Sequence, residues 1–413
     1  MHMFIYCFNS KITMFTKDEL ENLVKKNQDD LKKNLGIKRD FEVKLLNKFA
    51  TIISGIRRCG KSTLARQYVK NKKPIYYMYF EDVALTEFKT QDFATLDTIF
   101  NEQLGKNGIY FFDEIQNING WEIYIRQLTD RGEKVLITGS NATMLSRELG
   151  TKLTGRNLRY ELYPFSFNEF LKLEKKKPNT KNFIHYLELG GFPEYLKTKD
   201  KDLLRNLFQD IFYRDIIVRN DIRNESDLKS LLSYLSSNTG KTISYTKIKN
   251  ILKIKSVHTV TQFINACENA YLFFALTKYD PSIKKQLMAP KKIYCIDNAL
   301  VRLNSFRISP DYGRLLENLV FIELKRRGKE IYYHQEKNEC DFLVKEKDRI
   351  TEAIQVCYKV TTENKEREIN GLIEALKKHN LKNGIILTID QEDKLKEQGK
   401  IINIIPTWKW LLK

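Results

Sequence analysis

The segment 55–62 combines residue types and a spacing that suit the binding of a nucleoside triphosphate. It reads Gly-Ile-Arg-Arg-Cys-Gly-Lys-Ser, which fits the pattern G-x-x-x-x-G-K-[ST], and it directly follows the apolar run 49–53. The glycines let the backbone curl so that successive N–H groups point at phosphate oxygens, and a helix that starts there presents its positive end to them. The pattern therefore predicts a phosphate-binding loop between a strand and a helix.

The side chains of this loop have distinct expected roles. We expect Lys61 to reach the β- and γ-phosphates and Ser62 to hold Mg²⁺ through its hydroxyl. Arg57 and Arg58 are expected to brace either the phosphates or a nearby acidic pair. The residues expected to contact the nucleotide are Gly55, Ile56, Arg57, Arg58, Cys59, Gly60, Lys61, Ser62 and Thr63.

A pair of acidic residues, Asp113 and Glu114, follows the apolar run 109–112. It would lie at the carboxyl end of a strand, where the ligands of parallel sheets gather. Asp113 is expected to hold Mg²⁺, and Glu114 is expected to polarise the attacking water as a general base. Two acids at a strand end can also face solvent, but the preceding phosphate loop favours the catalytic interpretation.

Two later positions are candidates for contact with the transferred phosphate. The predicted strand 135–138 ends in small polar residues, so Ser140 or Asn141 is placed to hydrogen-bond the γ-phosphate or the attacking water. A plain turn would use the same Gly-Ser-Asn sequence, and both interpretations stay open. Arg156, on a loop farther on, is a candidate to stabilise charge on the phosphoryl group, in its own or a neighbouring subunit.

The elements that must position these residues follow from short apolar runs that alternate with helical stretches between about 49 and 160. This alternation predicts an α/β fold with a parallel sheet covered by helices. Ahead of it, a charged helical pattern from Asp18 to about Lys48 predicts a lead-in helix, assigned to the segment 1–37. The expected strands are 49–53, 75–80, 109–112, 135–138 and 158–162.

Beyond Pro164 the pattern is mostly helical, which predicts a helical region at 164–224 and a winged-helix-like domain at 225–305. The third helix of that domain should start after Ser256 and bury Val257, Val260, Ile264 and Cys267. Its other side has no Arg or Lys, and the helix includes Glu268. Two interpretations of this helix therefore stay open: it contacts DNA, or it has a role in packing or in oligomer formation. The outer residues are His258, Thr261, Gln262, Asn265 and Asn269.

The region 306–413 predicts a second, smaller α/β unit. Its order of a helical Glu317, a strand Asp341 and the next strand 353–357 resembles the core of PD-(D/E)XK nucleases. That chemistry needs carboxylates for Mg²⁺ and a lysine, but Gln355 and Cys357 stand at the E-x-K positions. Glu352 falls on the other strand face, and Lys359 has the right parity only if the strand continues. A degraded domain that binds DNA is therefore favoured over an active nuclease.

Composition adds a preference for polyanionic partners. The 413 residues include 71 Lys+Arg and 52 Asp+Glu, a formal charge of +19, which favours nucleic acid although a lysine-rich composition alone can give it. The six cysteines form no C-x-x-C pair, which suits a reducing cytoplasm. No apolar run approaches the length of a membrane span, so no membrane association is expected.

The motifs taken together resemble a family of archaeal and bacterial AAA+ ATPases whose members are mostly uncharacterised. The likeness covers nearly the whole chain from about residue 38. It implies an AAA+ ATPase core at 38–163, ATP and Mg²⁺ as cofactors, a homo-oligomer that shares ATP sites, and Arg156 as an arginine finger. The segments that resemble the family are 55–62, 111–116, 138–141, 153–156, 164–170, 190–194 and 316–320.

Three functions remain open from the sequence. The first is an oligomeric ATPase that hydrolyses ATP to move or remodel DNA, with a protein client as the alternative substrate. The second is a metal-dependent DNA nuclease gated by ATP, which needs Asp341 and a complete metal site. The third is a nucleotide switch that binds a protein partner without hydrolysis, and the pair Asp113 and Glu114 argues against it.

Overall fold

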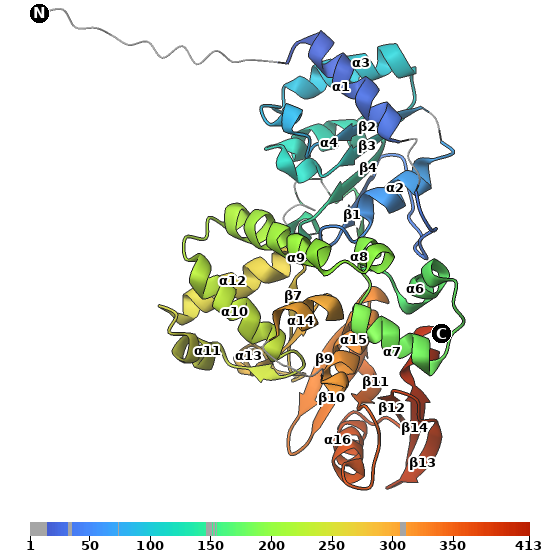
Figure 1. Cartoon of the computed structure of the whole chain (residues 1–413), viewed down its shortest axis with the longest axis vertical. Coiled ribbons are helices and arrows are strands. Elements are labelled where there is room, and N and C mark those ends of the chain that lie inside the picture. The colour runs from blue at the N-terminus through green and yellow to red at the C-terminus, as the bar shows by residue number, and fades with distance from the viewer. Residues whose placement is uncertain are drawn as a thin grey trace, which may run out of the picture. The chain divides into compact units, whose positions relative to one another are not determined.

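The chain forms two compact units, seen in the computed structural model of Figure 1. The structure describes residues 15–31, 35–72, 74–145, 151, 153, 155–305 and 311–413. The first unit comprises the described residues of Met1–Ile53, Ser62–Gly139 and Met144–Tyr160. The second comprises those of Ser54–Lys61, Ser140–Thr143 and Glu161–Lys413.

The first unit is built on a five-stranded sheet with the strand order β2-β3-β4-β1-β5. Neighbours β2 and β3, and β3 and β4, pair in parallel. β-branched and aromatic residues dominate the strands. The middle strands β1 and β3 are buried along their whole length and β4 is buried after its first residue, as parallel strands covered on both faces require. The predicted parallel α/β fold is confirmed, with strand ends within one residue of expectation. The strands are β1 Ala50–Ser54, β2 Ile75–Tyr79, β3 Ile109–Asp113, β4 Lys134–Gly139 and β5 Asn157–Glu161.

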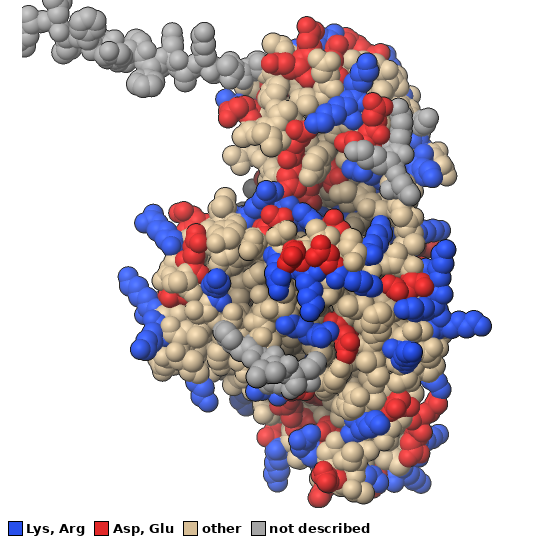
Figure 2. Space-filling model, viewed as in Figure 1, with Lys and Arg blue, Asp and Glu red and all other residues tan. Residues whose placement is uncertain are grey.

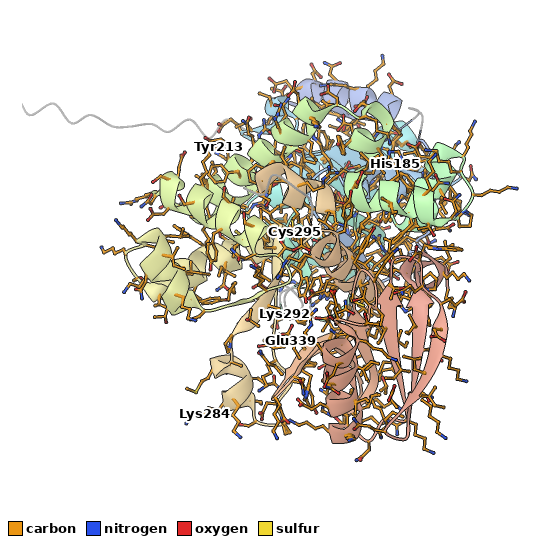
Figure 3. All side chains as sticks on the ribbon, turned by 60° about the horizontal axis from the view of Figure 1, so that its bottom comes forward. His185, Tyr213, Lys284, Lys292, Cys295 and Glu339 are labelled. Carbon is orange, nitrogen blue, oxygen red and sulfur yellow. The ribbon has the colours of Figure 1, made fainter. Side chains whose placement is uncertain are left out.

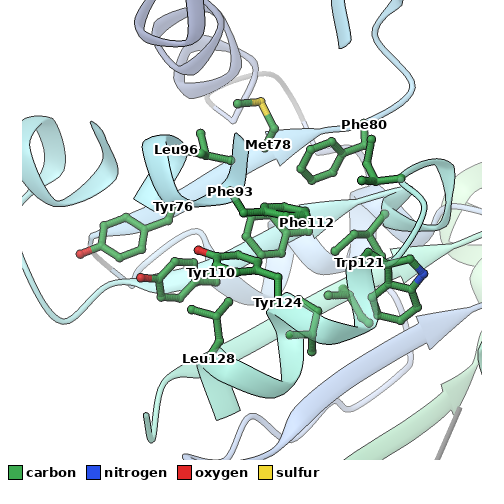
Figure 4. Close-up of a cluster of buried hydrophobic side chains, with 14 of the residues drawn as sticks. Tyr76, Met78, Phe80, Phe93, Leu96, Tyr110, Phe112, Trp121, Tyr124 and Leu128 are labelled. Carbon is green, nitrogen blue, oxygen red and sulfur yellow. The ribbon is translucent and has the colours of Figure 1, made fainter. Parts of the chain in front are cut away.

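An aromatic core fastens two helices to this sheet (Figure 4). Phe93 and Tyr124 stack with ring centroids 4.2 Å apart, and both rings pack near Phe112 of β3. Such large buried rings supply much of the apolar area that stabilises a domain of this size. The sheet that carries the acidic pair is therefore held rigidly. The helices of this unit include α2 Lys61–Val69, α3 Asp92–Leu104 and α4 Trp121–Asp130.

The N-terminal helix is shorter than the sequence pattern suggested. Helix α1, Lys17–Asp30, begins with a capping box of Thr16 and Glu19, and residues 35–48 contain no helix or strand. Its last turn has Asp29 and Asp30 and no basic residue, so like charges meet at the helix end. The prediction of helix to about Lys48 is wrong for this reason, and residues 1–14 of the predicted lead-in segment lie outside the described residues.

The second unit opens with short helices, as predicted. The first of these short helices are α6 Phe167–Glu174, α7 Thr180–Leu189, α8 Pro193–Thr198 and α9 Lys201–Asp210, followed by the π-helical turn η4 Ile211–Ile217.

No described helix of the chain has both the length and the apolar composition that a membrane span needs.

Five helices and a small antiparallel sheet follow among the described residues 225–305. In helix α12 the predicted start after Ser256 is confirmed, because its hydroxyl accepts a hydrogen bond from Thr259 N. Val260, Ile264 and Cys267 are buried as expected, whereas Val257 is exposed in the first turn. The sheet order is β6-β8-β7. The elements are α10 Glu225–Ser237, β6 Thr242–Ile243, α11 Tyr245–Leu252, α12 Val257–Asn269, β7 Phe273–Leu276, α13 Ile283–Met288, β8 Lys291–Cys295 and α14 Asn298–Asn304.

The C-terminal part is a six-stranded mixed sheet with the order β13-β14-β12-β11-β10-β9. The predicted smaller α/β unit is present, but β13 and β14 were not foreseen. Strand β13 reads Asp-Lys-Leu-Lys-Glu, a charged pattern that suits an edge strand and hides its β propensity. The elements are α15 Tyr312–Arg326, β9 Glu330–Gln335, β10 Glu339–Glu346, β11 Arg349–Val356, α16 Lys365–Lys378, β12 Asn383–Thr388, β13 Asp393–Glu397, β14 Lys400–Pro406 and α17 Thr407–Leu411.

Candidate functional site

Asp113 is the centre of a hydroxyl cluster in the first unit. It ends β3 and is fully buried, and its Oδ1 accepts hydrogen bonds from Ser62 Oγ at 2.8 Å and from the Thr138 hydroxyl. Its Oδ2 accepts a hydrogen bond from the Tyr77 hydroxyl at 3.2 Å. The structure thus brings together the two residues, Ser62 and Asp113, that the sequence assigns to Mg²⁺.

The surroundings of Asp113 also set its charge. Burial raises the pKa of Asp113, and the nearby Glu114 raises it further, while the hydrogen bonds from Thr138 and Ser62 oppose this shift. Arg66 contacts the cluster through Tyr77, because its Nη2 donates a hydrogen bond to the Tyr77 hydroxyl at 2.8 Å. These contacts stabilise one orientation of the carboxylate.

Three members of this cluster were missed from the sequence, namely Arg66, Tyr77 and Thr138. A signal for Tyr77 exists in the strand register. Tyr79 of β2 pairs with Asp113 of β3, and a residue two positions earlier in a strand points to the same face. No comparable periodic signal marks Arg66, which lies on helix α2.

Glu114 has an uncommon backbone conformation for a residue other than glycine, with φ 56° and ψ 42°. Its N–H donates to Thr138 Oγ1 at 3.1 Å, and Gln116 Nε2 donates to its Oε2 at 2.5 Å. The side chain is buried. Left-handed backbone at such a point is kept only when the surrounding contacts fix it, and here they hold the carboxylate at the carboxyl end of β3.

The phosphate loop, described as part of the second unit up to Lys61, packs closely against the backbone of Leu162. A side chain at Gly55 would put its Cβ 2.1 Å from the Leu162 carbonyl oxygen, so only glycine fits there. Cys59 Sγ donates to the same oxygen at 3.4 Å. Lys61 Nζ donates to the Ile56 carbonyl oxygen at 3.2 Å and is largely buried. The loop therefore encloses the ammonium group of Lys61.

Arg57 of the loop binds a buried carboxylate far along the chain. Its Nε lies 2.8 Å from Asp215 Oδ2 and its Nη2 lies 3.2 Å from Oδ1, a two-bond contact. Asp215 belongs to the π-helical turn η4 and is 2% exposed. It also accepts a hydrogen bond from Ser140 Oγ at 3.4 Å and pairs with Arg219 at 3.3 Å. Asp215 thus joins the loop to the segment after β4.

Arg58 contacts acidic residues on two helices. It lies 3.0 Å from Glu194 of α8 and 3.4 Å from Asp210 of α9, with its own backbone at φ 60°. The two loop arginines therefore bind carboxylates of the helical segment, a partner set that the sequence analysis did not identify.

The positions of Asn141 and Arg156 were less certain from the sequence. Asn141 Oδ1 accepts a hydrogen bond from Thr143 N at 2.9 Å, so its side chain forms a local turn here. Arg156 Nη1 lies 2.9 Å from Asp130, and its carbonyl oxygen accepts a hydrogen bond from Ala50 N. Arg156 therefore lies next to the first residue of β1, whereas the phosphate loop follows the last residue of that strand. The two ends of β1 are about 13 Å apart. Arg156 is thus not brought beside the Asp113 cluster of its own chain.

A second acidic cluster lies in the C-terminal part, beside a cleft of about 900 Å³. Glu317 of α15 and Asp341 of β10 meet as predicted, and both bind Lys292 of β8, at 2.9 and 2.7 Å. Gln355 Oε1 accepts a hydrogen bond from Asp341 N, and its Nε2 donates to Glu368 Oε2 at 2.7 Å. Lys292 was missed because only the folded small sheet brings it to these carboxylates.

The remaining positions compared with the nuclease core are 357 and 359, and neither provides the lysine on strand β11 that cleavage needs. Strand β11 ends at Val356, so the strand parity invoked for Lys359 does not extend to it, and its side chain is exposed at the cleft. Burial raises the pKa of the Cys357 thiol to about 12, so it is uncharged at neutral pH. No cation stands at the last E-x-K position.

Comparisons with known families cover most of the chain. Residues 47–171 match the family described as AAA domain. Residues 180–309 and 312–410 match two further families, DUF8612 and DUF4143, each described as a domain of unknown function. The AAA match spans both the phosphate loop and the acidic pair.

Relatives match over almost their full length. The uncharacterised protein MJ1544 of Methanocaldococcus jannaschii is 34% identical over an alignment of 424 positions that covers 95% of each chain. An uncharacterised protein of Haemophilus influenzae is 32% identical over an alignment of 391 positions that covers 88% of this chain and 94% of its own. Among solved structures, the Walker-type ATPase paby2304 of Pyrococcus abyssi has a TM-score of 0.40 and 13% identity, covering 70% of this chain and 95% of that one.

The expected AAA identity of the N-terminal part is confirmed by the family match, and the full-length likeness extends it to a family of whole proteins. The winged-helix and nuclease-like interpretations of the later parts stay predictions. This chain belongs to the family that includes MJ1544 and the H. influenzae protein, and its N-terminal part is an AAA domain with the P-loop ATPase fold.

Proposed function

We propose that this protein hydrolyses ATP, with Mg²⁺ as cofactor. The observation that carries the proposal is the convergence of Ser62, Thr138 and Tyr77 hydroxyls on the buried carboxylate of Asp113, with Glu114 next to it at the strand end. Hydroxyl and carboxylate oxygens are the hard ligands that suit Mg²⁺. Ser62 and Asp113 are the residues that would hold it, and its chemistry there is to neutralise charge on the phosphates.

The other residues of the site bind the phosphates and activate the attacking water. Lys61, at the start of α2, supplies a positive charge for the β- and γ-phosphates, and the N–H groups of the helix start and loop add hydrogen bonds. Glu114 orients the attacking water and takes its proton as the bond to the γ-phosphorus forms, while the bond from the γ-phosphorus to the bridging oxygen breaks and ADP leaves. A switch that binds nucleotide without hydrolysis has no need of a fixed carboxylate at this place, which favours the enzyme.

The Mg²⁺ part of this proposal has a direct test. Ser62→Ala removes one oxygen ligand and leaves Asp113, so the apparent affinity for Mg²⁺ in ATP turnover should fall by about 10-fold. Phosphate release is measured against Mg²⁺ concentration at saturating ATP. Ser226→Ala, at an exposed position of α10, is the matched control and should behave as the wild type. An unchanged Mg²⁺ dependence in Ser62→Ala contradicts the assignment.

We further propose that ATP turnover is coupled to DNA, through the three-helix segment of the second unit. The order α10, β6, α11, α12, β7, β8 corresponds to that of a winged helix, whose third helix commonly enters a DNA groove. Glu268 does not oppose such a contact from the outer face, because its carboxylate is turned inward and accepts a hydrogen bond from Ala275 N at 2.9 Å.

Exposed lysines supply the positive charge that α12 itself lacks. They lie on helix α11, on the turn that precedes α12 and on α13, and basic side chains project around this part of the chain in Figure 2. Contacts between lysines and phosphates provide most of the affinity of proteins for DNA. These lysines are Lys247, Lys253, Lys255, Lys284 and Lys285.

DNA coupling predicts that duplex DNA stimulates ATP turnover, and that the stimulation fades as salt rises from about 50 to 200 mM. Reversing two charges on α13, Lys284→Glu with Lys285→Glu, should weaken DNA binding by about 10-fold and leave basal turnover unchanged. The control reverses Lys181 and Lys197, exposed on α7 and α8. Equal losses in both double variants, or no stimulation by any nucleic acid, would favour a protein client instead.

A further inference from the structure

Lys292 places an ammonium group at the centre of the C-terminal acidic cluster. Figure 3 labels it next to Glu339, one member of the cluster. Its Nζ lies 2.9 Å from Glu317 Oε1, 2.7 Å from Glu339 Oε1 and 2.7 Å from Asp341 Oδ1. The lysine side chain is only 1% exposed. Three carboxylates from α15 and β10 therefore surround one cation that comes from a different sheet.

The charge of Lys292 is secured by this arrangement. Burial opposes the charged form, but the carboxylates of Asp341 and Glu317 outweigh burial and hold the pKa of Lys292 well above its ordinary value. Without a cation, three carboxylates this close would repel one another, and two of them, Glu317 and Asp341, are largely shielded from solvent. The cluster consequently requires a positive charge at its centre, and the chain provides it.

The carboxylates keep their orientation through donors other than Lys292. The Tyr294 hydroxyl donates to Glu317 Oε1 at 2.7 Å, and Val356 N donates to Asp341 Oδ2 at 2.9 Å. Oxygens from three carboxylates around one point are also the ligands that Mg²⁺ and Mn²⁺ prefer. Metal–oxygen distances are about 2.0–2.2 Å, so the oxygens would have to move inward by only about 0.7 Å. The position of the ammonium group therefore suits a divalent ion.

We propose that Lys292 is a built-in cation that takes the place of a divalent metal, so that Glu317, Glu339 and Asp341 hold no metal in the native protein. An ammonium group and a divalent ion repel each other, and only one of them fits at the centre. In this arrangement the cluster joins β8 of the small sheet to the C-terminal sheet through charge, without phosphodiester cleavage. The proposal involves neither the phosphate loop nor ATP, so it stands apart from the proposed ATPase.

The test is a titration of the full-length, nucleotide-free protein with Mn²⁺, in which free Mn²⁺ is measured by electron paramagnetic resonance. Wild type and Asp341→Asn should bind Mn²⁺ equally, because the cluster contributes no site in either. Lys292→Met removes the cation and should gain one site per chain that binds at least about 10-fold more tightly than any in the wild type. Mn²⁺ should also raise the melting temperature of this variant and not that of the wild type.

Two further variants make the outcome decisive. Lys292→Met combined with Asp341→Asn should lose the gained site, and Lys292→Arg, which keeps a positive charge, should not acquire one. A folded Lys292→Met protein without a new Mn²⁺ site overturns the proposal. If Lys292→Met does not fold, the comparison of wild type with Asp341→Asn decides, because a Mn²⁺ site present in the first and absent in the second would show that the native cluster binds metal.

Discussion

Replacing Glu114 with Gln is expected to lower ATP turnover by about 10²- to 10⁴-fold while nucleotide binding is retained. The amide keeps the size of the side chain, and its oxygen can still accept the hydrogen bond from Gln116 Nε2, so the local fold should persist. An amide is not a base and cannot take the proton of the attacking water. Phosphate release and the binding of a fluorescent ATP analogue are measured on the same preparation.

The control for this variant is Glu87→Gln, an exposed carboxylate of the same unit that makes no contact with the Asp113 cluster. It should retain wild-type turnover. Retained turnover in Glu114→Gln would contradict its role as the base, whereas loss of both binding and turnover would indicate that the substitution disturbs the fold around Thr138, whose hydroxyl accepts the N–H of residue 114.

Replacing Lys61 with Ala should reduce both the binding and the hydrolysis of ATP. Loss of a charge-assisted hydrogen bond costs about 1.5–3 kcal/mol, which corresponds to about 10- to 100-fold in affinity. Charge that develops on the phosphates during transfer makes the effect on turnover larger, about 10²- to 10³-fold for one lost donor. Titration calorimetry and phosphate release at saturating ATP separate the two effects.

Lys70→Ala is the matched control, because Lys70 is exposed directly after the same helix α2. It should leave affinity and turnover unchanged. If Lys61→Ala binds and hydrolyses ATP as the wild type does, the phosphate loop is not the catalytic site, and the function proposed for the AAA domain fails with it.

Much of the first unit could be predicted because its signals are local. The strands β1 to β4 are compact apolar runs, and the loop 55–62 lies between a strand and a helix that each have their own pattern. Ser62 and Asp113 could also be paired in advance, since the end of one strand and the start of the helix that follows another strand meet at the same edge of a parallel sheet. Local pattern and topology were sufficient for these residues.

The residues that were missed act through contacts between distant parts of the chain. Asp215 receives Arg57 from 158 positions earlier, and Lys292 reaches Asp341 across 49 positions. No periodicity or spacing in the sequence marks Asp215 or Lys292. Charged residues in helices and strands are mostly exposed to solvent, so the sequence does not indicate that these two are buried. Strand β13 was missed for a related reason, since its charges mask a strand at the sheet edge.

The contact between Arg57 and Asp215 bears on how the nucleotide site comes into being as the chain is synthesised. The ribosome releases Arg57 long before Asp215, so the loop 55–61 gains its buried carboxylate only after the helical segment has emerged. Removing one partner of such a buried pair costs about 3–5 kcal/mol. In a fragment that ends at residue 163 the loop lacks this carboxylate, so we expect the loop conformation to be less stable there than in the full chain.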